Sequence, residues 1–80
     1  MSGPASLDTA ARGLWERLRE WRSSVARDTG VPAYVVFHDA TLAEIARERP
    51  LSEEELGQIT GVGARKLERY GPALLELLRQ

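Results

Sequence analysis

A pair of glycines directly ahead of a cationic stretch is the part of this sequence whose residue types and spacing best suit chemistry. Gly61 and Gly63 precede a segment that carries Arg65, Lys66 and, one turn later, Arg69. Glycine lets a chain turn tightly and lets another backbone approach closely. The first amides of a helix that begins there carry partial positive charge and suit a phosphate. The spacing therefore indicates a phosphate-binding helix start, but a glycine pair equally suits a steric turn between two packed helices.

The three cations after the glycine pair are spaced so that they share one face of a helix. They are able to follow a phosphate strand together, or they simply form a solvated face. If three or four cations each neutralise a phosphate, the affinity for single-stranded nucleic acid falls with a log–log salt slope of about −2 to −3.

Two aromatic residues are candidates for contact with a base or a partner. Tyr34 has a flat ring that either stacks on a base, which needs no sequence specificity, or closes the core as a partly buried side chain. Trp15 lies just off the apolar stripe of its segment, with Arg19 and Arg22 on the next two turns. We expect it to pack at the edge of the bundle. The alternative is a half-exposed ring stacked on a cation, which would suit a base platform or a protein contact. Trp21 lies on the stripe and is assigned to the core.

The middle of the chain is acidic, whereas its two ends are basic. Residues 39–59 hold six carboxylates against two arginines, and the whole chain has a net charge of −1. A balance of this kind argues against strong binding of nucleic acid. Four glutamates are candidates for a docking patch that binds a basic partner: Glu48, Glu53, Glu54 and Glu55. The alternative is that acidic residues are simply favourable at a helix start.

Catalysis and metal binding find little support in the composition. The chain has no cysteine and one histidine, so it offers neither a disulfide, a thiolate zinc site nor a metal cluster. We expect His38 to make a local hydrogen bond, and we expect no enzyme activity and no cofactor. Eighty residues make one domain, and no apolar run is long enough to span a membrane. The sequence predicts a soluble protein with a disordered lead-in or linker over residues 1–6 and a folded domain over residues 7–80.

Hydrophobic periodicity predicts an all-α fold, a compact bundle of about five helices with one long and four short. The long helix spans residues 7 to about 27, is capped by Asp8 or Ser6, and ends at the Thr29–Pro32 stretch. An extended or single-turn connector follows over residues 34–37. A second helix is expected from residue 39 to about 49 with Asp39 as cap, and a short third helix opens at the Ser52 capping box and buries Leu56 and Ile59. A fourth helix is expected from the glycine pair to about residue 70. Gly71 and Pro72 are expected to end that helix and start the last one.

Four blocks together resemble the HRDC domain, the helicase-and-RNase-D C-terminal module of RecQ helicases. They are LWERLREWR (14–22), PAYVVFHDATL (32–42), RPLS (49–52) and GVGARKLERYG (61–71). They occur in the family's order and spacing, over about residues 7–79. The resemblance implies a five-helix bundle without catalytic machinery, whose helicase motor lies elsewhere in a longer bacterial protein.

The resemblance also implies a surface for single-stranded or branched DNA. In bacterial members that surface is a basic patch with an exposed aromatic residue, which corresponds to Tyr34 here. The matching basic positions are Arg19, Arg22, Arg65, Lys66 and Arg69. We expect a monomeric, cytoplasmic and nucleoid-associated module that binds DNA weakly, contacts other domains of its helicase and tunes substrate choice in repair and recombination. The alternative is a regulatory module that docks through its acidic helices onto the helicase core or another protein.

Overall fold

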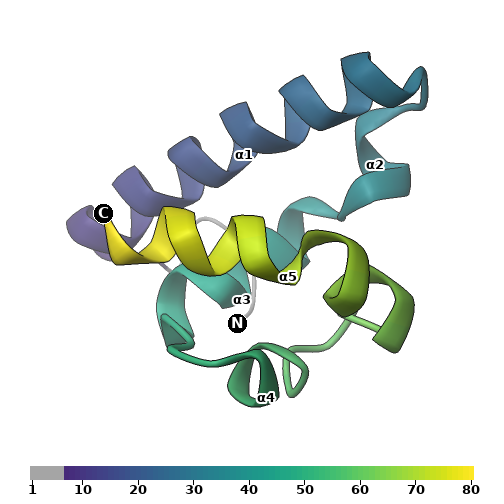
Figure 1. Cartoon of the computed structure of the whole chain (residues 1–80). Coiled ribbons are helices and arrows are strands. Elements are labelled where there is room, and N and C mark those ends of the chain that lie inside the picture. The colour runs from purple at the N-terminus through teal and green to yellow at the C-terminus, as the bar shows by residue number, and fades with distance from the viewer. Residues whose placement is uncertain (1–6) are drawn as a thin grey trace.

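The computed structural model describes residues 7–80, and these form helices joined by short turns (Figure 1). In chain order the helices are α1 (Thr9–Thr29), α2 (Ala33–Val36), α3 (Asp39–Glu48), α4 (Glu53–Leu56) and α5 (Ala64–Arg79). The predicted all-α fold is confirmed. The lead-in predicted for residues 1–6 lies outside the described residues.

The long helix α1 begins and ends where its sequence predicts, to within two residues. Asp8 is the N-cap, and its Oδ1 accepts a hydrogen bond from the Ala11 amide at 2.8 Å. Gly30 ends the helix in a left-handed conformation with φ 71°, which glycine adopts without steric cost. Its amide donates to the Ala26 and Arg27 carbonyls, so the last turn of α1 is closed by backbone hydrogen bonds.

Helices α1, α3 and α5 enclose the core. Figure 1 shows α5 running back in the opposite direction to α1, and the two helices are in contact. Arg17 of α1 fixes this arrangement, because its Nη2 donates to the Leu77 carbonyl at 3.4 Å and to the Gln80 side chain at 3.1 Å. The largest side chains with no accessible surface come from all the main elements: Leu18, Phe37, Leu42, Ile45, Leu56 and Leu74.

The connector between α1 and α3 is a single helical turn, one of the two forms expected. Val36 and Phe37 are buried, whereas Tyr34 and Val35 point to solvent. The turn has extended backbone on either side, at Pro32 and at Phe37, and a hydrogen bond from the Val35 amide to the Pro32 carbonyl closes it. The turn thus exposes the first two side chains of this segment, Tyr34 and Val35, and buries the next two, Val36 and Phe37.

The predicted helix break at Gly71 and Pro72 is wrong, because α5 runs through both residues. A proline usually excludes the helical conformation from the residue before it, by a clash with that residue's Cβ. Gly71 has no Cβ, so this clash is absent. Gly71 is also buried, and a Cβ there would lie 3.3 Å from Leu67 Cδ1. The described residues form five helices, the number predicted. The last two predicted helices are the single helix α5, and the connector, as the one-turn helix α2, brings the number back to five.

Two predictions about the start of α3 are also wrong. The N-cap residue is His38, not Asp39, and no side chain caps the helix. The Asp39 carboxylate instead forms an ion pair with Arg22, which draws it away from the amides it would cap. A local hydrogen bond of the His38 side chain is absent among residues 7–80, and its ring stacks on Tyr34 with centroids 6.1 Å apart.

The serine half of the predicted capping box at α4 is confirmed, whereas the Glu55 side chain bonds the amide of Leu51 rather than that of the N-cap residue Ser52. Ser52 Oγ accepts from the Glu55 amide at 3.1 Å, and Glu55 Oε1 accepts from the Leu51 amide at 2.9 Å. Leu56 and Ile59 are buried below this turn, as predicted. No helix within residues 7–80 combines the length and the apolarity needed to cross a bilayer.

Candidate nucleic-acid interface

The two glycines of the turn before α5 differ in what they do. Gly61 has φ 95°, and a Cβ there would collide with Thr41 Oγ1, so this position requires glycine for the fold itself. Gly63 is the N-cap of α5 in ordinary extended conformation, with open space around its α-carbon. No side chain caps α5, so its first amides point out of the helix without a capping partner.

The cations of α5 begin within its first turn, at its second residue. Lys66 Nζ lies 5.2 Å from the centroid of the Phe37 ring, and Arg69 Cζ lies 5.6 Å from that of Tyr70. Arg65 is exposed. Within residues 7–80, none of these three cations forms an ion pair with a carboxylate. Their charge is therefore not neutralised locally, and two of them are held over aromatic faces.

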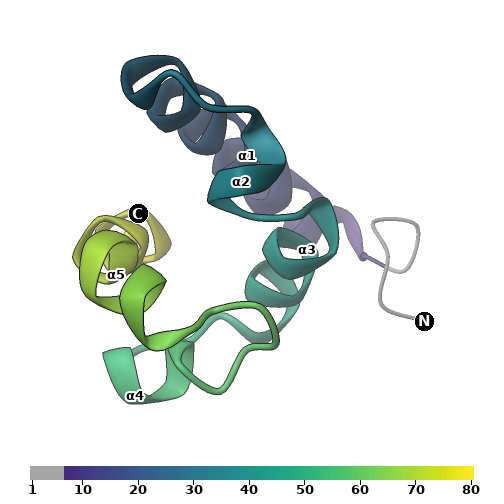
Figure 2. The same cartoon turned by 90° about the vertical axis from the view of Figure 1, so that its right-hand side faces the viewer.

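Tyr34 is the most exposed aromatic side chain of the described residues, with 61% of its surface accessible. Its ring is stacked on that of His38 at an interplanar angle of 30°. Sequence reasoning missed its neighbour Val35, which is 47% exposed and extends the same apolar patch. Figure 2 brings to the front the side of the molecule that carries α2 and the start of α5. The reading of Tyr34 as a core residue does not fit this exposure.

Arg22 does not lie on the surface as a phosphate-binding residue would. It is buried with 7% exposure, and its Nη1 donates to the Phe37 carbonyl at 2.8 Å. Its Nη2 lies 2.7 Å from Asp39 Oδ1. Because both ends of the guanidinium already have partners, the structure removes Arg22 from the set of direct contacts.

The two tryptophans are buried to different extents. Trp15 is buried, with 7% exposure, and its Nε1 donates to the Asp39 carbonyl at 3.3 Å, so the expected packing fits and the half-exposed alternative does not. The cation contact is nevertheless present, because Arg19 Cζ lies 4.7 Å from the Trp15 ring centroid. Trp21 is only half-buried and packs against Phe37 and Tyr70. Since α1 packs on α3 as well as on α5, its buried surface is wider than a single stripe.

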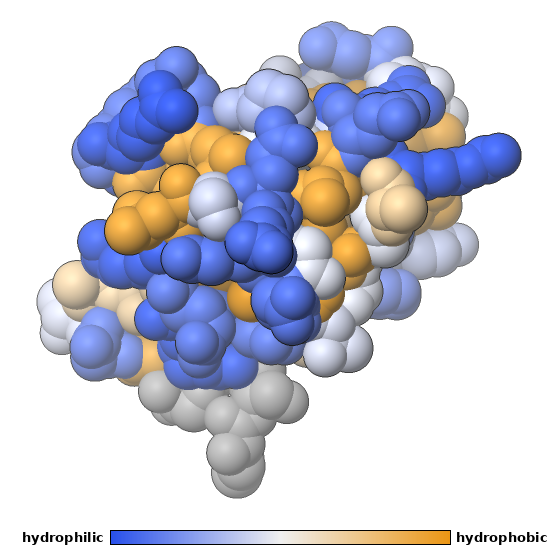
Figure 3. Space-filling model, turned by 60° about the horizontal axis from the view of Figure 1, so that its bottom comes forward, coloured by the Kyte–Doolittle hydropathy of each residue, from blue (hydrophilic) through white to orange (hydrophobic). Residues whose placement is uncertain are grey.

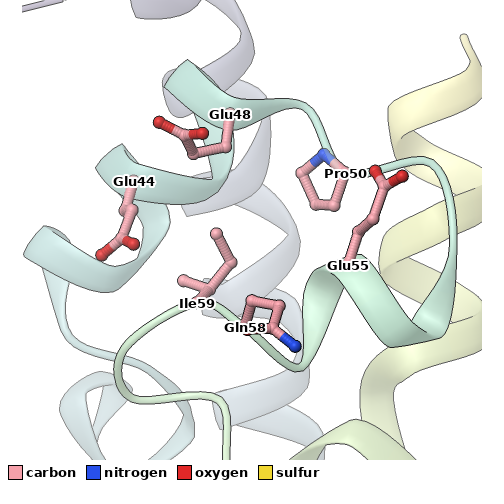
Figure 4. A pocket seen from close by; sticks show the side chains of 6 residues that line it. All are labelled: Glu44, Glu48, Pro50, Glu55, Gln58 and Ile59. Atoms are coloured by element: carbon pink, nitrogen blue, oxygen red, sulfur yellow. The ribbon is translucent and has the colours of Figure 1, made fainter.

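An acidic hollow lies on the side of α3 and α4. It encloses about 340 Å³ and is lined by Glu44, Glu48, Glu55, Gln58, Pro50 and Ile59 (Figure 4). Leu51, next to Pro50, is 83% exposed, a feature that sequence reasoning missed. Glu53 and Glu54 are exposed on the first turn of α4. In Figure 3, which brings the underside of the molecule forward, apolar surface is interrupted by many polar side chains.

Residues 7–80 contain no group of three or more histidine, cysteine, aspartate or glutamate side chains placed to hold a metal ion. The described residues do present an exposed aromatic ring, cations without a carboxylate partner, an uncapped helix start and a separate acidic hollow.

Comparison with known proteins identifies the family of this domain. Residues 11–78 match the model of the HRDC domain. The chain is 51% identical over 63 residues to the ATP-dependent DNA helicase UvrD2 of Mycobacterium tuberculosis, an alignment that covers 79% of this chain and 9% of that protein. It is 44% identical over 69 residues to the ATP-dependent DNA helicase RecQ of Haemophilus influenzae, which covers 86% of this chain and 11% of that protein.

A solved structure shows the same fold. The Deinococcus radiodurans RecQ HRDC domain 3 superposes with a TM-score of 0.84 at 35% identity, over 89% of this chain and 93% of that domain. The chain thus matches one whole domain but spans only about a tenth of the length of the two helicases. HRDC domains are non-catalytic accessory domains of helicases, and this chain belongs to the HRDC domain family.

Proposed function

We propose that this domain binds single-stranded or branched DNA weakly and thereby tunes which substrates a bacterial RecQ- or UvrD2-type helicase engages in repair and recombination. The observation that carries the proposal is that Lys66 lies over the ring of Phe37, three residues after the exposed Tyr34. Lys66 and its neighbours Arg65 and Arg69 have no carboxylate partner among the described residues. The open amides after Gly63 add positive partial charge at the start of α5, and Arg19, which lies over Trp15, is a further candidate contact. The module acts as a monomer at the nucleoid, attached to the motor domains of its helicase.

The expected interaction has two physical components. Stacking of a base on Tyr34 is worth about 1–3 kcal/mol and is independent of sequence, because every base has a flat face. Three phosphate contacts from the α5 cations give a log–log salt slope of about −2. With a net charge of −1, the chain has little long-range attraction for DNA, so the binding is weak and local.

The test is a fluorescence anisotropy titration of the 80-residue chain with a labelled oligothymidylate at two salt concentrations. We expect Tyr34→Ala to weaken binding roughly tenfold or more at both salts. Lys66→Met should weaken binding more at low salt and should reduce the salt slope by about 0.7. Leu51→Ala and Arg27→Met are the matched controls, an exposed apolar residue and a cation outside the proposed surface. An affinity that changes neither with salt concentration nor on replacement of Lys66 would contradict the proposal.

The acidic hollow supports a second candidate function, docking onto the helicase core or another protein. Three carboxylates surround an opening with Pro50 and Ile59 in its lining, next to the exposed Leu51. This combination suits a basic side chain with an apolar neighbour on the partner. Replacing Glu44 and Glu48 by lysine in the full-length helicase should then change unwinding while the domain's own affinity for DNA does not fall. Unchanged unwinding would argue against docking at the hollow.

A further inference from the structure

We propose that Arg22 is a positioning residue for DNA binding, one that acts through Phe37 and Asp39 to hold Tyr34 in place relative to Lys66. This inference rests on the proposed function, because it assigns a role within the same surface. Arg22 itself is buried and does not reach the DNA.

The Arg22 side chain joins α1 to both sides of the segment between α2 and α3. Nη1 donates to the carbonyl of Phe37, the residue that ends α2, and Nη2 pairs with Asp39, the first residue of α3. Trp15 adds a second tie from α1, since its indole donates to the Asp39 carbonyl. Two side chains of one long helix therefore fix the backbone between Tyr34 and α3.

The burial of Arg22 indicates that these contacts determine its position. Its side chain is only 9% exposed, and its Nε has no hydrogen-bond partner among the described residues. A guanidinium that gives up hydration and leaves one donor unsatisfied is stabilised chiefly by the partners it does have. A solvated arginine would be expected to keep all its donors satisfied by water.

Phe37 links this anchor to the cationic side of the surface. Its ring is fully buried, contacts Trp21 and Tyr70 at centroid distances of 6.2 and 5.7 Å, and lies under the Lys66 ammonium. Its carbonyl is the one that Arg22 holds. One residue thus connects α1, the Tyr34 turn and the first cations of α5.

Helix α2 depends on such contacts for its orientation. It has four residues, and no side chain caps its start. A single helical turn does not persist without tertiary packing, because helix nucleation is unfavourable. Val36 and Phe37 bury one side of the turn, and the Arg22 contact fixes its end. If that contact is lost, Tyr34 is expected to sample several orientations rather than one.

A double-mutant cycle in DNA binding tests this role. We expect Tyr34→Ala to weaken oligothymidylate binding about tenfold in the native background, but less than about threefold when Arg22 is methionine. Arg22→Lys, which keeps the charge but does not span both partners, should give an intermediate factor. Arg27→Met removes a cation from the same helix and should leave the Tyr34→Ala factor unchanged. Equal factors in the native and Arg22→Met backgrounds would overturn the inference.

Amide hydrogen exchange gives an independent readout that needs no DNA. Loss of the Arg22 contacts should speed exchange of the Val35 and Phe37 amides, which bond within α2, relative to the Arg49 amide at the end of α3. If Arg22→Met does not fold, Asp39→Asn weakens the same contact from its half-exposed side and carries the test. Unchanged exchange at α2 would reject the positioning role. Failure of the native chain to bind DNA would reject the proposed function, while the exchange result would still decide whether Arg22 orders α2.

Discussion

Single residues in the turn before α5 serve the fold and the surface separately. Gly61 is required by backbone conformation and by the close approach of Thr41, whose hydroxyl donates to the Thr60 carbonyl at 3.3 Å. Gly63 meets neither constraint and instead leaves the start of α5 without a side-chain cap. The glycine pair therefore contains one structural residue and one that favours access to the helix amides.

Gly61→Ala should destabilise the domain. A left-handed backbone conformation costs an L-residue about 1–2 kcal/mol, and the added methyl group also overlaps Thr41. We expect a loss of about 2 kcal/mol or more in the free energy of unfolding, which corresponds to a fall in Tm of about 8–16 °C for a domain of this size. Thermal unfolding followed by circular dichroism measures it.

Gly13→Ala is the matched control for this substitution. Gly13 lies inside α1 with open space around it, so alanine should raise stability by about 0.5–1 kcal/mol through its helix propensity. If Gly61→Ala has the same Tm as the native chain, the argument from φ and from Thr41 fails.

At the scale of elements, α5 shows how a local signal is overridden. Pro72 lies in the ninth position of a 16-residue helix and leaves the Glu68 carbonyl without its usual amide donor. The helix continues because Gly71 removes the steric obstacle and because Leu74, two residues beyond Pro72, is completely buried. Tertiary packing thus decides a boundary that proline and glycine alone would place differently.

Pro72→Ala should therefore stabilise the domain. Alanine restores an amide to the helix, a gain partly offset by greater freedom of the unfolded chain, so we expect about 1–2 kcal/mol. Urea denaturation measures this change. Gly71→Ala should act in the opposite direction, because its methyl group crowds both Leu67 and the Pro72 ring. A loss of stability in Pro72→Ala would show that proline contributes favourable packing at this exposed position.

The elements that could be predicted from sequence are those with strong local signals. The stripe of α1, the Asp8 cap and the Ser52 cap each depend on neighbouring residues, and each is confirmed. Helix α3 was placed correctly, but its cap was not, because Asp39 is drawn to Arg22, 17 positions earlier in the chain. The burial of Trp15 likewise follows from the packing of α1 on α3. Long-range partners of this kind leave no local pattern in a sequence.

The candidate surface was predictable in residue type but not in arrangement. Tyr34 and the α5 cations follow from the resemblance to the HRDC family, and their role in DNA binding stays a prediction. The burial of Arg22 and the position of Lys66 over Phe37 depend on the contact between α1, α2 and α5. The spacing of charges along a helix does not distinguish a solvated arginine from one that anchors a neighbouring element.

At the scale of the whole molecule, charge is separated along the chain: the acidic residues 39–59 lie between two basic ends. The molecule measures 31 × 24 × 24 Å. The Debye length is about 30 Å at 0.01 M salt but about 8 Å at 0.15 M. At low salt the acidic residues of α4 therefore act on DNA bound elsewhere on the molecule, whereas near physiological salt they are screened.

Neutralising Glu53 and Glu54 together should consequently raise the affinity for single-stranded DNA only at low salt. For two charges and three phosphates separated by about the width of the molecule, screened Coulomb repulsion of about 0.5 kcal/mol disappears, which is roughly twofold in affinity at 0.01 M salt. Glu55 is left in place because it bonds the Leu51 amide. Anisotropy titrations at 0.01 and 0.15 M salt measure the change, and Gln58→Glu should shift low-salt affinity the opposite way. A gain that persists at 0.15 M would place α4 within direct reach of the DNA and move the binding surface away from Tyr34.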